Sequence, residues 1–246
     1  MASLQGRTAI VTGSTRGLGE AMARRLHASG AEVCITGRSE DRAAEIAAEL
    51  GDRAWSAPLE ASSRDSFAAV VDAAMSRWGR VDILVNNAGA TPARPFLQIS
   101  DDEWDDVLAT NLRSVFIGCQ LVAPLMRTQG FGRIVNHASL AGQQGGVVAG
   151  AHYAASKAGI IVLTKIVARE LAGDGVTVNA IAPAAIEAPI MAEMPEDAIA
   201  RARASIPVGR FGRPEEVAAL VAYLCSDDAG YVTGATIDIN GGLSMR

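Results

Sequence analysis

Seven short apolar runs, each followed by a longer segment with helical periodicity, constrain the fold of this 246-residue chain more than any other feature. Most of these runs are rich in β-branched residues and apolar at consecutive positions, which is typical of strands buried on both faces. The alternation predicts an α/β fold, a doubly wound parallel sheet of seven strands flanked by helices and joined by right-handed crossovers. The predicted strands read TAIVTG, EVCITG, RAWSAP, VDILVNN, GRIVNHAS, VTVNAIAP and ATIDING.

Capping residues at the predicted helix ends agree with this spacing. Ser100 and Glu103 form a capping-box pattern at the start of a long helix over about 101–128, and Pro214 suits the first turn of a later helix. Glycine commonly follows the last turn of a helix, because it adopts the left-handed conformation without strain. The glycines expected to end helices are Gly30, Gly51 and Gly79.

The length of the chain allows one large domain or two small ones. No linker, internal repeat or low-complexity tract interrupts the alternation, so one domain over residues 1–246 is predicted. The single irregular stretch, residues 184–209, lies between the sixth predicted strand and the next helix. We expect this stretch to be either a helical cover over a substrate or a plain surface excursion.

Composition and charge exclude several other classes of protein. The net charge is −5 and no basic run is present, so nucleic acid is not an expected partner. No apolar run approaches the roughly 18 residues that a membrane span needs, and the first residues lack the pattern of a signal peptide. A soluble, cytoplasmic protein with no membrane partner is predicted. The three cysteines are far apart in apolar stretches, which indicates buried free thiols and no metal site: Cys34, Cys119 and Cys225.

A glycine-rich loop, in the stretch TGSTRGLGEAMARRL, joins the first predicted strand to the first predicted helix. Glycine there permits a sharp turn, close approach of the backbone to a pyrophosphate, and close packing of helix on strand. The start of the helix then offers free N–H groups and a partial positive charge to phosphates. The position favours nucleotide binding over a bare turn. The residues assigned to it are Gly13, Thr15, Arg16, Gly17, Leu18 and Gly19.

The end of the second predicted strand indicates which dinucleotide binds. A cofactor with a free ribose 2′-hydroxyl is usually met there by an acidic residue. This strand instead ends with Gly37 followed by Arg38, and Arg16 in the glycine loop supplies a second guanidinium. Two arginines and no carboxylate suit a 2′-phosphate, although both are also compatible with ordinary surface arginines. We therefore predict NADP(H) in preference to NAD(H).

Tyr153 and Lys157, in HYAASKAG, combine two scarce residues, since the chain has three tyrosines and two lysines. In a helix this spacing places both side chains on one face, one turn apart. A free phenol with a pKa near ~10 is poorly matched to proton transfer at neutral pH. A neighbouring ammonium and the positive nicotinamide of an oxidised cofactor favour the phenolate. The pair predicts an acid–base site, with an incidental surface pair as the alternative.

Further motifs occur in a familiar order along nearly the whole chain. They are TGxxxGxG at 12–19, NNAG at 86–89, Asn111 in the long predicted helix, Ser139 after RIVNHA, YxxxK at 153–157, and the closing DINGG. Together they resemble the short-chain dehydrogenase/reductase family, and in overall pattern its β-ketoacyl-acyl-carrier-protein reductase-like branch. The resemblance implies a single Rossmann-type domain. Five of the marked positions follow predicted strands and are expected to meet in one crevice: Gly13, Arg38, Asn87, Ser139 and Pro183.

The resemblance also implies roles for four catalytic residues. Tyr153 would exchange the proton with the substrate oxygen, and Lys157 would hold the nicotinamide ribose while favouring the phenolate. Ser139 would steady the substrate oxygen as charge develops. Asn111 would hold a water that links Lys157 to solvent. As alternatives, Ser139 would satisfy a backbone group at the strand end, and Asn111 would stabilise an irregular helical turn.

The remaining expected contacts fall into two sets. Beyond the glycine loop, the cofactor is expected to meet Arg38, Glu60, Ala61, Asn87, Ala88, Gly89, Tyr153, Lys157, Pro183, Ala184 and Ile186. The substrate is expected to meet Ser139, Ala141, Gln143, Gln144, Tyr153, Ala185 and Met191, and His152 faces either the substrate or the core.

Four positions depart from the family pattern. Glu60 stands where an aspartate usually contacts adenine, and Ala188 replaces a threonine that commonly meets the nicotinamide carboxamide. Ala184 replaces a glycine, which costs on the order of 1 kcal/mol if that residue takes a positive φ. Asp174, in the turn after the YxxxK helix, would repel an acidic carrier protein.

We therefore expect an enzyme, an NADP(H)-dependent oxidoreductase that interconverts a ketone and a secondary alcohol, such as a general carbonyl reductase. The alternative within the family is a 3-oxoacyl-[acyl-carrier-protein] reductase. The alternative from another class is a catalytically silent nucleotide-binding sensor or scaffold. By resemblance, a homotetramer assembled through the helices at 101–128 and 153–173 is also expected.

Overall fold

The predicted apolar runs pair side by side in one sheet. The computed structural model describes residues 3–146, 149–188, 191 and 195–245. In this part of the chain, seven parallel strands form a sheet in the order β3-β2-β1-β4-β5-β6-β7. The predicted α/β fold is therefore confirmed. The strands are β1 Thr8–Val11, β2 Glu32–Gly37, β3 Ala54–Pro58, β4 Ile83–Asn86, β5 Gly132–His137, β6 Val176–Pro183 and β7 Thr236–Ile239.

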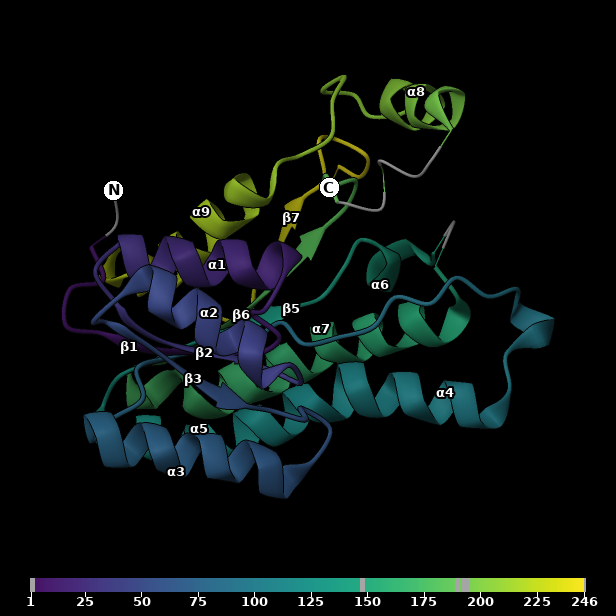
Figure 1. Ribbon diagram of the computed structural model, residues 1–246. Coiled ribbons are helices and arrows are strands. Elements are labelled where there is room, and N and C mark those ends of the chain that lie inside the picture. The colour runs from purple at the N-terminus through teal and green to yellow at the C-terminus, as the bar shows by residue number, and fades with distance from the viewer. Residues whose placement is uncertain (1–2, 147–148, 189–190, 192–194, 246) are drawn as a thin grey trace.

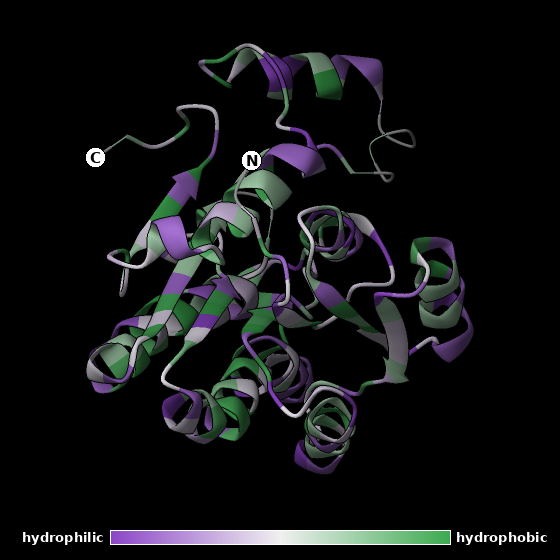
Figure 2. Cartoon of the chain, turned by 90° about the vertical axis from the view of Figure 1, so that its left-hand side faces the viewer, coloured by the Kyte–Doolittle hydropathy of each residue, from purple (hydrophilic) through white to green (hydrophobic). Residues whose placement is uncertain are grey.

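Helices cover both faces of the sheet, because the strands are apolar on both sides (Figure 1). One hydrophobic core lies under α1, α2 and α9, and the other lies under α3, α5 and α7. Figure 2 shows hydrophobic residues concentrated in the strands and in the helices packed on them. The α-helices are α1 Gly17–Ala28, α2 Glu40–Leu50, α3 Arg64–Trp78, α4 Asp101–Leu108, α5 Ser114–Gln129, α6 Ala141–Gln144, α7 Ala151–Leu171, α8 Glu196–Ala204 and α9 Pro214–Leu224. The short 3-10 turns are η1 Phe96–Gln98, η3 Ala172–Asp174 and η5 Asp227–Ala229.

The strand order places a switch point at the middle of the sheet. From β1 the chain proceeds outward to β2 and β3, and it then returns to β4 on the other side of β1. The loops after β1 and β4 consequently diverge toward opposite faces. Ligands of open α/β sheets bind in the crevice that this divergence leaves outside the carboxyl ends of the strands.

The caps expected at helix ends are present. The Ser100 hydroxyl accepts a hydrogen bond from the Glu103 backbone N–H at 3.2 Å, and α9 begins at Pro214. The Glu103 carboxylate bonds Arg94 and His152. The three glycines predicted to end helices all take positive φ at or next to a helix end: Gly30, Gly51 and Gly79.

The long helix expected over 101–128 is continuous but not uniformly α-helical. Between α4 and α5 lies a π-helical turn, η2 Ala109–Arg113, which contains Asn111. Such turns commonly occur at functional sites, because they rotate side chains out of the regular helical order. By length and composition alone Asp101–Gln129 would suffice to cross a membrane. In this structure 44% of its most apolar window is buried within the fold.

The irregular stretch 184–209 is anchored at its start. The backbone N–H of Glu187 donates to Gly212 O at 2.8 Å, and that of Gly212 donates to Ala185 O at 2.9 Å. The positive φ considered for Ala184 falls instead on Ala185, at 52°. Helix α8 has no buried residue and stands away from the sheet (Figure 1). Residues 189–190 and 192–194 of this stretch lie outside the described residues.

The cysteines are free and buried, as the sequence predicts. Burial raises the pKa of both Cys119 and Cys225 to about 12. Within the described ranges, no group of three or more His, Cys, Asp or Glu residues could hold a metal ion.

Candidate active site

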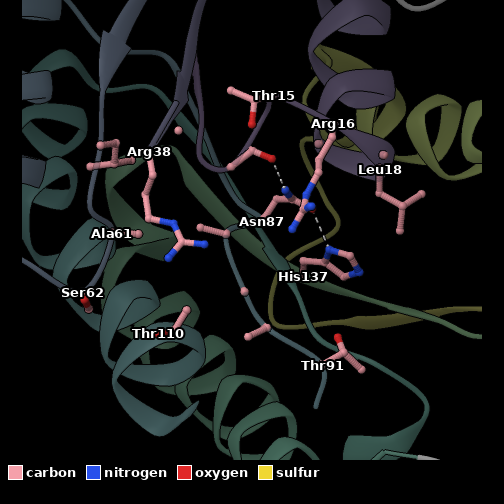
Figure 3. Close-up of a pocket in the computed structure, with 18 of the residues that line it drawn as sticks. Thr15, Arg16, Leu18, Arg38, Ala61, Ser62, Asn87, Thr91, Thr110 and His137 are labelled. Carbon is pink, nitrogen blue, oxygen red and sulfur yellow. Dashed lines mark hydrogen bonds between the residues drawn. The ribbon is translucent and has the colours of Figure 1, made fainter. Parts of the chain in front are cut away.

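A crevice of about 770 Å³ lies at the carboxyl ends of the strands (Figure 3). Segments from the first, second, third, fourth and fifth strand ends and from α7 meet in it. The predicted site residues that line it are Gly13, Thr15, Arg16, Gly17, Leu18, Gly19, Arg38, Glu60, Ala61, Asn87, Ala88, Gly89, Tyr153 and Lys157.

The glycine loop needs glycine for close approach as much as for its turn. Gly13 has φ +63°, and a Cβ there would lie 2.9 Å from Ala88 Cα. A Cβ on Gly19 would lie 2.2 Å from the Gly13 carbonyl oxygen. At the start of α1, Arg16 makes no side-chain cap, so the first N–H groups of the helix remain available to a ligand. This loop therefore has the form and the donors that a dinucleotide pyrophosphate requires.

Two arginines line the crevice from different segments. Figure 3 shows the side chains of Arg16 and Arg38 directed into the pocket from the loop after β1 and from the end of β2. Neither guanidinium forms an ion pair within the described part of the chain. Two cations without carboxylate partners suit a phosphate on the adenosine ribose. Glu60 lines the same crevice, where its carboxylate accepts a 2.9 Å hydrogen bond from the Ser62 hydroxyl.

Tyr153 and Lys157 also line the crevice. Both lie in the first two turns of α7, and Lys157 Nζ is 5.6 Å from the centroid of the Tyr153 ring. The helical spacing thus brings the phenol and the amine together, as the i,i+4 rule requires. Lys157 is 4% exposed, and its Nζ donates to the carbonyl oxygen of His137. Burial lowers the pKa of Lys157 to about 7, so its charge is poised at neutral pH.

Asn111 holds the first turns of α7 against the loop after β4. Its Oδ1 accepts from Ala90 N–H at 2.8 Å, and its Nδ2 donates to Ala90 O at 2.9 Å and to Ser156 Oγ at 3.1 Å. Ser156 in turn donates to Tyr153 O at 2.7 Å. Both donors of the Asn111 amide are therefore used in positioning the backbone around the phenol. The π turn presents this side chain between the two segments.

Ser139 lies just after β5, and its Oγ accepts from the Ala141 N–H at 3.1 Å. This contact satisfies a backbone group, as the alternative interpretation expects, and leaves the hydroxyl proton free to donate. Several other predicted contacts do not line the crevice in the described residues: Asn111, Ser139, Ala141, Gln143, Gln144, Pro183, Ala184, Ala185, Ile186 and Met191. Gln143 is turned away, since its amide donates to Asp238 in β7 at 2.7 Å.

His152, considered for either the substrate or the core, is fully buried. Its Nδ1 accepts from the Tyr153 N–H at 2.9 Å, so the proton lies on Nε2, which faces Glu103 Oε1 at 3.4 Å. Gly150 leaves room for the ring, because a Cβ there would lie 2.3 Å from it. His152 therefore connects α4 to the start of α7 through its two ring nitrogens, and it does not face the crevice.

Sequence reasoning missed several residues of the crevice. Thr12 Oγ1 accepts from the N–H groups of Asn87 and Ala88, both at 2.9 Å, and so joins the loops after β1 and β4. The signal in the sequence that could have indicated this role is a hydroxyl-bearing residue at the end of the first strand. The lining residues that were not predicted are Leu59, Ser62, Ala90, Thr91, Asp106, Thr110 and His137, whereas Gly37 and Ala188, singled out in the sequence beside the expected cofactor contacts, also line the crevice.

A doubly wound sheet with a glycine loop and a Tyr-Lys pair in one crevice defines a short-chain dehydrogenase/reductase. The family model described as enoyl-(acyl carrier protein) reductase matches residues 13–244. The 3-oxoacyl-[acyl-carrier-protein] reductases FabG of Salmonella typhimurium and Escherichia coli are 41% and 40% identical to this chain over 243 residues, 99% of it and of each relative. Nodulation protein G of a Rhizobium species is 44% identical over 246 residues, 100% of both chains. The chain belongs to the short-chain dehydrogenase/reductase family and is an oxidoreductase.

Proposed function

We propose that the protein is an NADP(H)-dependent oxidoreductase that interconverts a ketone and a secondary alcohol. One observation carries the proposal: a single crevice is lined by Arg16 and Arg38, which form no ion pair with any described residue, and by the neighbouring Tyr153 and Lys157. The arginines match a 2′-phosphate, and the phenol matches a proton donor. A nucleotide-binding sensor has no use for the second pair, so catalysis is favoured over the silent alternative.

The chemistry divides between the cofactor and the chain. When bound, the nicotinamide supplies or accepts the hydride at carbon. The chain supplies orientation and the proton at oxygen: the Tyr153 hydroxyl donates its proton to the carbonyl oxygen as that oxygen gains negative charge. By resemblance, Ser139 would donate a second hydrogen bond to the same oxygen, since its hydroxyl donates to no other described residue.

After Tyr153 has donated its proton, Lys157 stabilises the phenolate that is left. An ammonium one helical turn from a phenolate stabilises it. The Lys157 amine is shielded from solvent, because it is buried and donates a hydrogen bond to the His137 carbonyl oxygen. By resemblance, the same Nζ would hold the nicotinamide ribose hydroxyls. Asn111, fixed by Ala90 and Ser156, sets the position of this helix. By resemblance, it would also hold the water that returns the proton.

A 3-oxoacyl thioester is the second candidate substrate. The relatives named 3-oxoacyl-[acyl-carrier-protein] reductase favour it, and so does the environment of Asp174. From the sequence, the Asp174 carboxylate is expected to repel an acidic carrier protein. In the structure it accepts a 2.7 Å hydrogen bond from Arg127, and this pairing offsets its charge. A second hollow of about 610 Å³, beside the start of α7, supports a largely apolar substrate. Its lining residues are Ala93, Arg94, Pro95, Phe96, Gly145, Gly146, Ala149, Gly150, Ala151 and Ala154.

The whole chain, 1–246, acts in this proposal as one cytoplasmic domain, with 184–209 as a cover over the substrate. Pro183, Ala184 and Ile186 would also contact the cofactor. Assembly into a homotetramer through α4, α5 and α7 is supported by large, exposed apolar side chains on α5 and α7. Phe116 is 44% exposed, and Val162 and Ile166 are each 56% exposed.

We expect the purified protein to oxidise NADPH when given a 3-oxoacyl thioester, such as acetoacetyl-coenzyme A, and to do so faster than with NADH. The loss of NADPH absorbance measures the rate. A heat-inactivated sample serves as the control for chemical reduction. Turnover of simple ketones without thioesters would favour a general carbonyl reductase. No absorbance change with any ketone or alcohol in a broad panel would contradict the enzymatic proposal and favour the sensor.

A further inference from the structure

His137 is a polar residue of the crevice to which nothing above assigns a role. It ends β5, and its ring lines the crevice with Tyr153, Lys157 and Ala188. Its backbone carbonyl accepts from Lys157 Nζ, which places it next to the proposed catalytic pair. Its Nδ1 lies 2.8 Å from Asn87 Oδ1. The ring is therefore held at the nicotinamide end of the proposed cofactor site.

The hydrogen bonds of Asn87 fix where the imidazole proton lies. Asn87 Nδ2 donates to the carbonyl oxygens of Thr12 and Gly13, at 2.9 and 3.0 Å. Two carbonyl acceptors require the amide nitrogen on that side, so the atom facing His137 is an oxygen. His137 Nδ1 must then carry a proton to donate to it. In a neutral ring Nε2 is left with a free lone pair, which makes it an acceptor.

The ring is neutral at ordinary pH. Burial and the nearby Lys157 lower the pKa of His137 to about 3. Nε2 has no hydrogen-bond partner within the described residues, nor is it one of the buried atoms left unsatisfied. In Figure 3 the ring turns its Nδ1 edge to Asn87 and its opposite edge away from it. A bare acceptor at this position is suited to a ligand that carries an N–H or O–H donor.

The cofactor has two kinds of donor near this end of the site, the ribose hydroxyls and the carboxamide N–H₂. Lys157 is already assigned to the hydroxyls, and Ala188 in the crevice wall has no polar side chain. We propose that Nε2 of His137 accepts a hydrogen bond from the nicotinamide carboxamide and so positions the ring for hydride transfer. This inference depends on the proposed NADP(H) function. His137 would be a cofactor-positioning residue.

A comparison of two ligands tests this contact by binding alone. The 3-acetylpyridine analogue of NADPH has a methyl ketone in place of the carboxamide and therefore no N–H donor. We expect wild-type protein to bind it about tenfold more weakly than NADPH, as the loss of one neutral hydrogen bond allows. The dissociation constants are measured by titration of intrinsic and cofactor fluorescence. Equal affinity of the wild-type protein for the two ligands would overturn the proposal without any variant.

The matched variant is His137→Asn, whose Nδ2 can still donate to Asn87 while Nε2 is lost. It is expected to bind NADPH about tenfold more weakly and the analogue unchanged, so the difference between the ligands disappears. An equal effect on both ligands, or none, would show that the ring acts only on the structure. The fragment 2′,5′-ADP lacks the nicotinamide and should bind both proteins alike. Failure of wild-type protein to bind either 2′,5′-ADP or NADPH would refute the cofactor proposal itself.

Discussion

Tyr153→Phe is expected to lower kcat for ketone reduction by about three orders of magnitude, the contribution typical of a positioned general acid. The variant loses only the hydroxyl, and that hydroxyl makes no hydrogen bond to another described residue, so the fold should be unchanged. NADPH should bind with nearly wild-type affinity, because Lys157 and the glycine loop remain. The rate of NADPH consumption and a fluorescence titration measure the two effects separately.

Tyr231→Phe is the matched control for this variant. Tyr231 is fully exposed at 103% and lies outside the crevice. Its loss of a hydroxyl should leave kcat unchanged. Near-normal turnover in Tyr153→Phe, with the control also active, would reject the assignment of the proton donor.

Arg38→Asp is expected to reverse the choice between the two dinucleotides. Removal of a charge-assisted hydrogen bond and introduction of a like charge should weaken NADPH binding by about a hundredfold. NADH has no 2′-phosphate, so its affinity should change by no more than about threefold, within the range of an exposed charge. The ratio of the two KM values, or of the two dissociation constants, reports the change directly.

Arg42→Asp provides the control for a change of charge nearby. Arg42 lies on α2, four residues along the chain, and its guanidinium pairs with Glu45 at 3.1 Å, outside the crevice. This variant should affect both cofactors equally and weakly. An equal loss of NADPH and NADH affinity in Arg38→Asp would show that Arg38 does not bind the 2′-phosphate.

Most of the fold could be predicted because its signals are local. Each strand is a short apolar run, and stops such as Gly51 and Gly79 take positive φ where the pattern expects them. The π turn at 109–113 was expected only as the alternative role of Asn111, because its helix has no proline or glycine there and the irregularity involves the contacts of Asn111 with Ala90 and Ser156. Those contacts join segments far apart in sequence.

Residues of the site were predictable to the extent that a motif marks them. The cofactor end follows from glycine spacing and from the position of Arg38 after β2, and the structure gathers these residues in one crevice. Gln143 was misplaced, because its partner Asp238 comes from β7, almost a hundred residues away. His137 was overlooked for a similar reason: only the pairing of its ring with Asn87, from the adjacent strand, reveals a free acceptor.

The central claim is that a buried lysine and a bound oxidised nicotinamide together make the Tyr153 phenol acidic. An unassisted phenol has a pKa near 10, so only about 1% of it is ionised at about pH 8. The most direct measurement is the ultraviolet absorbance of tyrosinate in the NADP⁺ complex at that pH, for wild-type, Tyr153→Phe and Lys157→Met proteins. The account predicts close to one tyrosinate in the wild-type complex and almost none in either variant. Identical spectra for all three complexes would contradict it.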